Sequence, residues 1–191
     1  MDQLGLYHQQ VGERPNLLVV SILAEYVTTR GVALDLGAGN LRDSKFLKKV
    51  GFNRVVAVDY SHESVPFLTE GIELEISPIQ VYKPEASTFD FVVSCNTLFF
   101  LNHEEISHLF KNIFVGLRAG GVFTCNVLGP EDDWIVKEGR QVGSFTRTSL
   151  RLQCKDFKIL GMREFKHRAA PPGTQNIKFW YQWSIALQKP A

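Results

Sequence analysis

The chain has 191 residues, of which 45% are hydrophobic and 12% aromatic, and its formal net charge at pH 7 is +1. A chain of this length can form a single α/β domain with a buried core. Because the charges almost balance, the composition gives no bulk attraction to nucleic acid or to an anionic membrane. The expected partner is therefore a small-molecule substrate, with no nucleic acid and no membrane.

Cysteine usage and hydropathy indicate the compartment. The three cysteines are odd in number and lack a C-x-x-C spacing, which favours a reducing environment. The apolar run 17–24 is too short to span a bilayer and is followed at once by Glu25. We therefore predict a cytoplasmic protein in which this run is a buried helix.

Strands and helices are predicted to alternate over the first two thirds of the chain. A helix over 17–29 follows Asn16 as its N-cap and stops before Gly31. Strands separated by helices form a parallel sheet. The strands are predicted at 32–36, 54–58, 72–76, 89–95 and 120–128, and the later helices at 40–50, 61–70 and 102–117.

The last third of the chain has a different pattern. The stretch "GPEDDW" at 129–134 is predicted to be a loop, with Asp132 and Asp133 in a solvated turn. A short helix over 146–156 precedes two strands, 157–165 and 178–188, with no helix between them. Two such strands are expected to pair antiparallel.

The stretch "VALDLGAGNLRD" at 32–43 leads a strand through a glycine turn into a helix. Gly37 and Gly39 let a ligand lie against the main chain at the carboxyl end of a parallel sheet. A dinucleotide fingerprint requires a third glycine, and Arg42 stands at that position. Asp35 would repel a phosphate but can receive an ammonium group.

An acidic residue at the end of the second strand adds a second feature. Asp59 lies twenty residues after Gly39, and its carboxylate can accept the hydroxyl groups of a ribose. Tyr60 follows, and its ring either packs on adenine or covers the edge of the sheet. Ammonium, ribose and adenine together describe S-adenosyl-L-methionine.

Four stretches, "VALDLGAGNLRDS", "VVAVDYS", "FDFVVSCNTLFFL" and "LRAGGVFTCNVLG", resemble the ordered motifs of class I S-adenosylmethionine-dependent methyltransferases. "NTLFFLNHEE" and the late "FWYQWSI" are similar to the branch that includes tellurite-resistance and other small-molecule methyltransferases. The resemblance implies an α/β fold with a Rossmann-like, doubly wound, mostly parallel seven-stranded sheet and an antiparallel C-terminal hairpin. It also implies one domain over 1–191, with a cofactor-binding core at 17–129 and substrate-side loops and strands at 130–191.

The resemblance further assigns residues to the cofactor. The methionine part would contact the glycine turn, the ribose Asp59, and the adenine Tyr60. The segment after the fourth strand would run past the cofactor toward the substrate. Where the family often has an acidic residue for the adenine amino group, this chain offers Gln80 as a side-chain acceptor. The residues so implied are Asp35, Gly37, Ala38, Gly39, Asp59, Tyr60, Gln80, Cys95 and Asn96.

Substrate-side candidates come from three other places. Residues 1–16 are either a mobile tail or a lid that brings Tyr7 and Arg14 over the site. Phe99 is a candidate wall of the pocket, and Trp134 a candidate substrate contact. No catalytic residue and no metal site is assigned, and Cys95 has no basic neighbour in sequence that would make it a nucleophile.

The predicted activity is methyl transfer to a small-molecule nucleophile (O, N, S or another chalcogen) by in-line displacement, which needs positioning more than a dedicated base. The alternative is a non-catalytic protein that binds S-adenosylmethionine or a partner and keeps the fold. A nicotinamide oxidoreductase is disfavoured by Arg42 and by the antiparallel strands at the end of the chain. The sequence does not indicate an oligomeric state.

Overall fold

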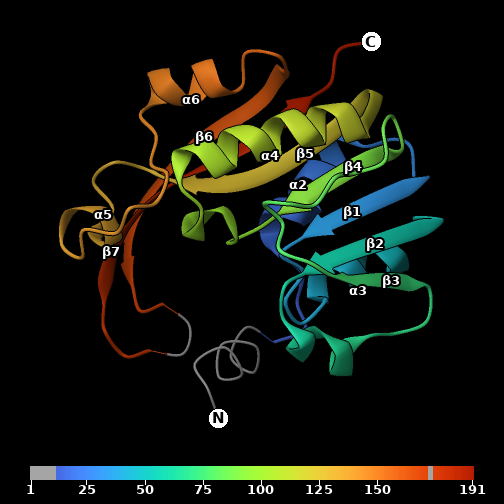
Figure 1. Ribbon diagram of the computed structural model, residues 1–191, viewed down its shortest axis with the longest axis horizontal. Coiled ribbons are helices and arrows are strands. Elements are labelled where there is room, and N and C mark those ends of the chain that lie inside the picture. The colour runs from blue at the N-terminus through green and yellow to red at the C-terminus, as the bar shows by residue number, and fades with distance from the viewer. Residues whose placement is uncertain (1–11, 172–173) are drawn as a thin grey trace.

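The structure is a computed structural model that describes residues 12–171 and 174–191. Within these residues the strands form one sheet whose order is β3-β2-β1-β4-β5-β7-β6, with helices on both faces (Figure 1). The strands are β1 (Val32–Leu36), β2 (Arg54–Asp59), β3 (Ile72–Ile76), β4 (Phe89–Ser94), β5 (Leu117–Leu128), β6 (Lys158–Ala169) and β7 (Lys178–Gln188).

Strand directions follow the prediction. Strands β1 to β5 pair parallel to one another, whereas β7 pairs antiparallel with both β5 and β6. Parallel neighbours need a crossover connection, which is usually a helix. The strands β6 and β7 have no helix between them and therefore pair antiparallel. The predicted Rossmann-like sheet with an antiparallel C-terminal hairpin is therefore confirmed.

Helices form a layer on each face of the sheet. α2 (Leu17–Tyr26) and α3 (Arg42–Lys49) lie behind the sheet in Figure 1, and α4 (His103–Gly116) lies in front. Side chains alternate across a strand, so Ala33 packs in the core beneath α2 and α3 while Leu34 packs beneath α4. This alternation also places Asp35 on the face of α2 and α3.

The predicted helices are all shorter in the structure, and the physical reason is clear for two of them. Asn16 and Asn102 cap α2 and α4 as expected. The helix predicted over 61–70 is only a 3₁₀ helix, η1 (His62–Phe67), which contains Pro66. Ser61 caps it, but the proline removes a backbone donor and the chain is extended again at Leu68. α2 ends at Tyr26 because Val27 is already extended.

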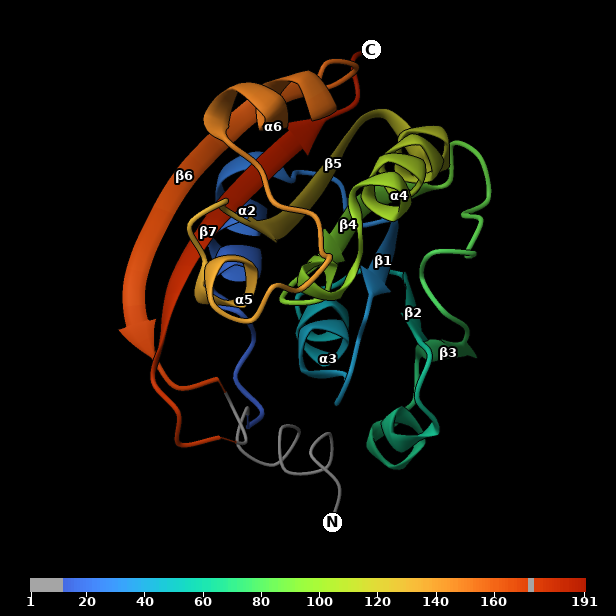
Figure 2. The ribbon, with the colours of Figure 1, turned by 60° about the vertical axis from the view of Figure 1, so that its left-hand side comes forward.

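The predicted loop at 129–134 is wrong in one respect. Residues 133–136 form a short helix, α5 (Asp133–Val136), and Figure 2 shows it against the hairpin. Asp132 and Asp133 are buried, with 0% and 7% of their surface exposed, so the predicted solvated turn is incorrect. Their carboxylates accept hydrogen bonds from β7, which a local reading of the turn could not foresee.

The remaining elements follow β4 and β5 in the chain. η2 (Leu98–Phe100) follows β4, and α6 (Arg147–Gln153), predicted over 146–156, is capped by Thr146. Leu128, the last residue of β5, pairs with Gln182, so the start of β7 extends beyond the carboxyl edge of the parallel strands. Among the described residues, no helix has the length and apolar character needed to span a bilayer.

Candidate functional site

The glycine turn, residues 37–41, joins β1 to α3 and is held by the end of β2. The amides of Gly37 and Ala38 donate to the carbonyl of Val58 at 2.8 and 3.1 Å. Gly37 has φ of +76°, and a Cβ there would lie 2.2 Å from Oγ1 of Thr97. Glycine is therefore required at position 37 both by the backbone conformation and by the close approach of the segment after β4.

Asp59 connects the end of β2 to the glycine turn. Its Oδ2 accepts the amide of Gly39 at 2.8 Å, and its Oδ1 accepts the amide of Ser61 at 2.9 Å. A carboxylate has about four acceptor positions, so two remain for ligand hydroxyl groups. The link between Asp59 and Gly39 is a structural role that sequence analysis missed, because only the packed strands bring the two residues together.

Asp35 is buried at the centre of this edge of the sheet. It is 2% exposed, and the hydroxyl of Ser44 donates to its Oδ2 at 2.6 Å. Burial, followed by the nearby charge of Asp43, raises the pKa of Asp35 to about 7. Asp43 is also buried, and burial likewise raises its pKa. Together with Asp59, these carboxylates give the site a negative potential that favours a cationic ligand.

The strap, residues 12–16, lies beside the glycine turn. The side-chain amide of Asn40 donates to the carbonyl of Gly12 at 3.1 Å, and the amide of Asn16 donates to Oδ1 of Asp43 at 2.7 Å. Arg14 is exposed in this segment. Tyr7 lies outside the described residues, so a lid formed by residues 1–16 stays a prediction.

The segment after β4 passes directly over the turn. Oγ1 of Thr97 donates to the carbonyl of Gly37 at 3.4 Å. Asn96 has a left-handed backbone, with φ of +56°, and its amide donates to Oδ1 of Asn126 at 2.7 Å. Sequence analysis missed Asn126, although an amide side chain inside a buried strand was a detectable exception.

The thiol of Cys95 is not activated in this environment. Burial and the charges of Asp43 and Asp35 raise the pKa of Cys95 well above its ordinary value. The side chain is therefore a neutral thiol at physiological pH, which fits its assignment as a site-lining residue and not as a nucleophile.

The predicted adenine side is more open. Tyr60 is 66% exposed at the end of β2, and Gln80 is half-buried in the connection between β3 and β4. Two surface grooves, of about 670 and 550 Å³, lie elsewhere: the first along Arg54 and Tyr82, the second along His103 and Arg140. Within residues 12–171 and 174–191, no group of three or more His, Cys, Asp or Glu side chains could hold a metal ion.

The tryptophan cluster, formed by Phe99, Phe100, Trp134, Lys178 and Trp180, joins η2, α5 and the start of β7. The Lys178 Nζ atom lies 4.0 Å and 3.6 Å from the ring centroids of Trp134 and Trp180 and pairs with the buried Asp132. Trp134 is only 8% exposed, so most of the predicted substrate contact is covered.

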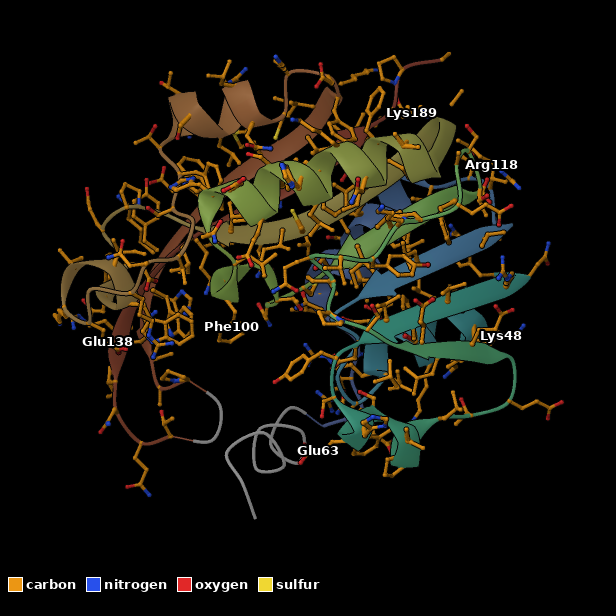
Figure 3. The ribbon with its side chains drawn as sticks, in the orientation of Figure 1. Lys48, Glu63, Phe100, Arg118, Glu138 and Lys189 are labelled. Carbon is orange, nitrogen blue, oxygen red and sulfur yellow. The ribbon has the colours of Figure 1, made fainter. Side chains whose placement is uncertain are left out.

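Phe100 is the exposed member of this cluster, and Phe99 is buried. Phe100 is 62% exposed, and its ring centroid lies 5.7 Å from that of Trp134. Figure 3 shows it projecting from η2 on the side of α5. Of the two phenylalanines, Phe100 is therefore the one whose ring is exposed, and the role of Phe99 as a wall of the pocket stays a prediction.

Solved structures define the class of fold. An S-adenosylmethionine-dependent methyltransferase from Mesorhizobium loti matches with a TM-score of 0.67 and 18% identity, over 90% of this chain and 95% of that chain. TehB from Haemophilus influenzae matches with a TM-score of 0.68 and 21% identity, over 90% of this chain and 61% of that chain. The fold is thus that of Rossmann-like methyltransferases.

The family follows from the sequence itself. Residues 18–160 match the family described as "Tellurite resistance protein TehB", and the chain belongs to this family. Over 94 residues, 46% of the chain, it is 34% identical to "Probable S-adenosyl-L-methionine-dependent methyltransferase TehB" from Haemophilus influenzae (strain ATCC 51907 / DSM 11121 / KW20 / Rd). That match covers 32% of the relative, about a third of its length. The predicted resemblance to the tellurite-resistance branch is confirmed.

Proposed function

We propose that the protein is an S-adenosyl-L-methionine-dependent methyltransferase that acts on a small-molecule nucleophile. The observation that carries this proposal is the grouping of Asp35, the glycine turn and Asp59 at the adjacent carboxyl ends of β1 and β2. Two buried carboxylates flank a turn whose glycines leave the main chain open to a ligand. This arrangement suits a cationic ligand with a ribose. The membership of the TehB family supports the same activity.

The residues present fit this cofactor. Asp35 is buried at the place assigned to the ammonium end, and a bound cation would favour its charged form. Asp59 has acceptor positions left for the ribose hydroxyl groups, and Tyr60 offers an exposed ring face beside it. When bound, the cofactor supplies a methyl group already activated by a sulfonium.

The protein's part in the reaction would be to position the acceptor and exclude water. An in-line displacement at an activated carbon gains mainly from holding the two reactants in the reactive geometry. The thiol of Cys95 has a raised pKa and is therefore a neutral, weak nucleophile. The acceptor itself would supply the nucleophile. The nearly neutral net charge of the chain supports a small acceptor with an O, N, S or other chalcogen nucleophile. The odd number of cysteines without a C-x-x-C spacing supports a cytoplasmic location.

Calorimetry and a methyl-transfer screen test this proposal. We expect binding of S-adenosylmethionine and of its demethylated product, and turnover with at least one acceptor among selenite, tellurite, thiols, phenols and amines. The Asp59→Ala variant should lose cofactor binding, because it removes both the ribose acceptors and the bond to Gly39. Binding of neither compound by the wild-type protein would overturn the proposal.

A non-catalytic protein that binds S-adenosylmethionine is the second candidate. It is favoured by the adenine side, where Gln80 stands in place of an acidic residue and Tyr60 is largely exposed. This candidate predicts cofactor binding in calorimetry without turnover of any acceptor in the screen. The same two measurements therefore separate the candidates.

A further inference from the structure

Three carboxamide side chains meet at the carboxyl edge of the sheet, on the face of α2 and α3. Asn96 follows β4, Asn126 lies in β5, and Gln182 lies in β7, and these strands are neighbours in the sheet. Asn126 pairs with Ser184 across the β5–β7 ladder and Leu128 pairs with Gln182, so Asn126 and Gln182 are diagonal neighbours on one face. We call these three residues the amide cluster.

A backbone amide fixes the orientation of the central carboxamide. The amide N–H of Asn96 donates to Asn126 at 2.7 Å, and a backbone N–H can only donate. The atom that receives it must therefore be Oδ1 of Asn126. The Nδ2 group of Asn126 then faces the other two members, at 2.7 Å from Asn96 and 3.4 Å from Gln182.

This orientation propagates through the cluster. Because Nδ2 of Asn126 is a donor, the atoms facing it must be the carbonyl oxygens, Oδ1 of Asn96 and Oε1 of Gln182. Their NH₂ groups consequently point away from Asn126. Neither side chain makes another hydrogen bond within residues 12–171 and 174–191, and both are half-buried. The cluster thus presents hydrogen-bond donors outward.

The place of the cluster separates it from the proposed adenosine end. β4 lies next to β1 on the side opposite β2, and β5 and β7 lie farther in that direction. Thr97, next to Asn96, contacts the glycine turn through its hydroxyl. The donors therefore lie beyond the turn, away from Asp59 and Tyr60. Of the buried carboxylates, Asp59 lies on the far side of the turn, whereas Asp35 and Asp43 lie close to Cys95, the neighbour of Asn96.

We propose that Asn126 is a positioning residue that turns the carboxamide NH₂ groups of Asn96 and Gln182 toward the methyl acceptor. The amide cluster then selects an acceptor that presents oxygen lone pairs beside its nucleophile, and disfavours one that presents N–H groups there. This inference rests on the proposed function. An asparagine is suited to the central position because it accepts one hydrogen bond and donates two, without adding a charge close to the buried Asp35 and Asp43.

The orientation is measured first, by NMR of the side-chain amides of the wild-type protein without an acceptor. We expect the NH₂ protons of Asn126 to exchange slowly with solvent, and those of Asn96 and Gln182 to exchange rapidly. Slow exchange at Asn96 or Gln182 together with rapid exchange at Asn126 would overturn the inference. This result does not depend on finding an acceptor.

The Gln182→Glu variant, at a half-buried position, tests whether the amide cluster selects the methyl acceptor. A glutamate still accepts from Asn126 but presents a carboxylate oxygen in place of the NH₂ group. With a phenol that carries a second oxygen substituent next to its hydroxyl group, we expect KM to rise about tenfold, since a neutral hydrogen bond contributes roughly three- to tenfold and is replaced by repulsion between two acceptors. The affinity for S-adenosylmethionine should stay within about twofold of wild type, because the ribose and ammonium contacts lie elsewhere.

The Asn126→Leu variant removes the positioning without touching the acceptor directly. Both outer carboxamides then lose their fixed orientation, and KM for the same phenol should rise by about three- to tenfold with a smaller change in kcat. Thr124→Val is the matched control: Thr124 is buried on the same face of β5, and its hydroxyl donates to the carbonyl of Ile185 in β7 at 2.9 Å. Its KM should equal that of wild type.

The outcomes separate the inference from the proposed function. Absence of cofactor binding by wild type would contradict the proposed function itself. Unchanged KM in both variants, with cofactor binding and turnover intact, would overturn only the inference. A loss of cofactor affinity with unchanged KM would show that the donors hold the cofactor's carboxylate, which also contradicts the inference.

Discussion

Single residues of the site show how one side chain can serve both fold and ligand. Asp59 holds Gly39 through one carboxylate oxygen and Ser61 through the other. The glycine turn is therefore shaped before a ligand arrives, and the acceptor positions that remain face the same edge. Asp35 differs, because burial raises the pKa of its carboxyl group. The hydroxyl of Ser44 donates to this carboxyl group.

The pKa of Asp35 predicts a pH dependence of stability. Its pKa is about 7 in the folded protein and 3.8 ordinarily, so its stabilising contribution is complete below about pH 3.8 and is lost as the pH rises through 7. We expect Asp35→Asn to raise the free energy of unfolding of the cofactor-free protein at pH 8, on the order of 2 kcal/mol. Urea unfolding at pH 5 and pH 8 measures this. A difference between variant and wild type that does not grow with pH would contradict it.

The Gly37→Ala variant tests the glycine turn. A left-handed alanine costs about 1–2 kcal/mol, and the contact with Thr97 adds about 1–3 kcal/mol. Gly120→Ala is the control, because Gly120 has φ of +77° with nothing within 4 Å of its Cβ position. Thermal unfolding should show a clearly larger loss for Gly37→Ala, and equal losses would rule out the close approach of Thr97.

At the scale of elements, a buried ion pair fastens α5 to β7. Lys178 and Asp132 are 5% and 0% exposed, and Asp132 also accepts the amides of Trp134 and Tyr181 at 3.0 and 2.9 Å. Burial lowers the pKa of Lys178, against the effect of Asp132, which raises it. The pair holds the tryptophan cluster in place beside Phe100.

Breaking this pair should be costly. Lys178→Met leaves the carboxylate of Asp132 buried without its cation, which costs about 3–5 kcal/mol. Lys137→Met is the control, because the Lys137 side chain is 64% exposed in its pair with Asp133 and such surface pairs contribute only about 0–1 kcal/mol. Chemical denaturation measures both. Similar losses in the two variants would show that the buried pair is not stabilised by its surroundings.

At the scale of the molecule, the carboxyl edge of the parallel strands brings together segments that are far apart in the sequence. The strap contacts the glycine turn, and the segment after β4 contacts both the turn and β5. A ligand in this place would add contacts to β1, β2 and β4 together. Its binding should therefore stabilise the whole domain and not a single loop.

Ligand-linked stability tests this expectation. With the demethylated product of S-adenosylmethionine at a hundred times its Kd, the free energy of unfolding should rise by about 2.7 kcal/mol. Asp59→Ala should show no rise at the same concentration. Thermal unfolding with and without the compound provides the measurement, and a stabilised Asp59→Ala variant would show that the ribose lies elsewhere.

The elements of the sheet could be predicted because their causes are local. Hydrophobic residues bounded by turn residues set β1 and β3 at their predicted bounds, and Asn16, Ser61 and Asn102 cap helices where expected. The glycine turn and the acidic residues at two strand ends were also visible, since their spacing lies within one βα unit.

The sequence by itself determined the order of strands and helices, the parallel sheet with its final hairpin, and the glycine turn with Asp35 and Asp59 at neighbouring strand ends. Only the tertiary structure decided how Asp59 holds Gly39, that Asp132 is buried with Lys178, and which way the carboxamides of the amide cluster point. Each of these depends on partners between 20 and 56 residues apart. Strand register and packing bring such partners together, and no local pattern of residues specifies them.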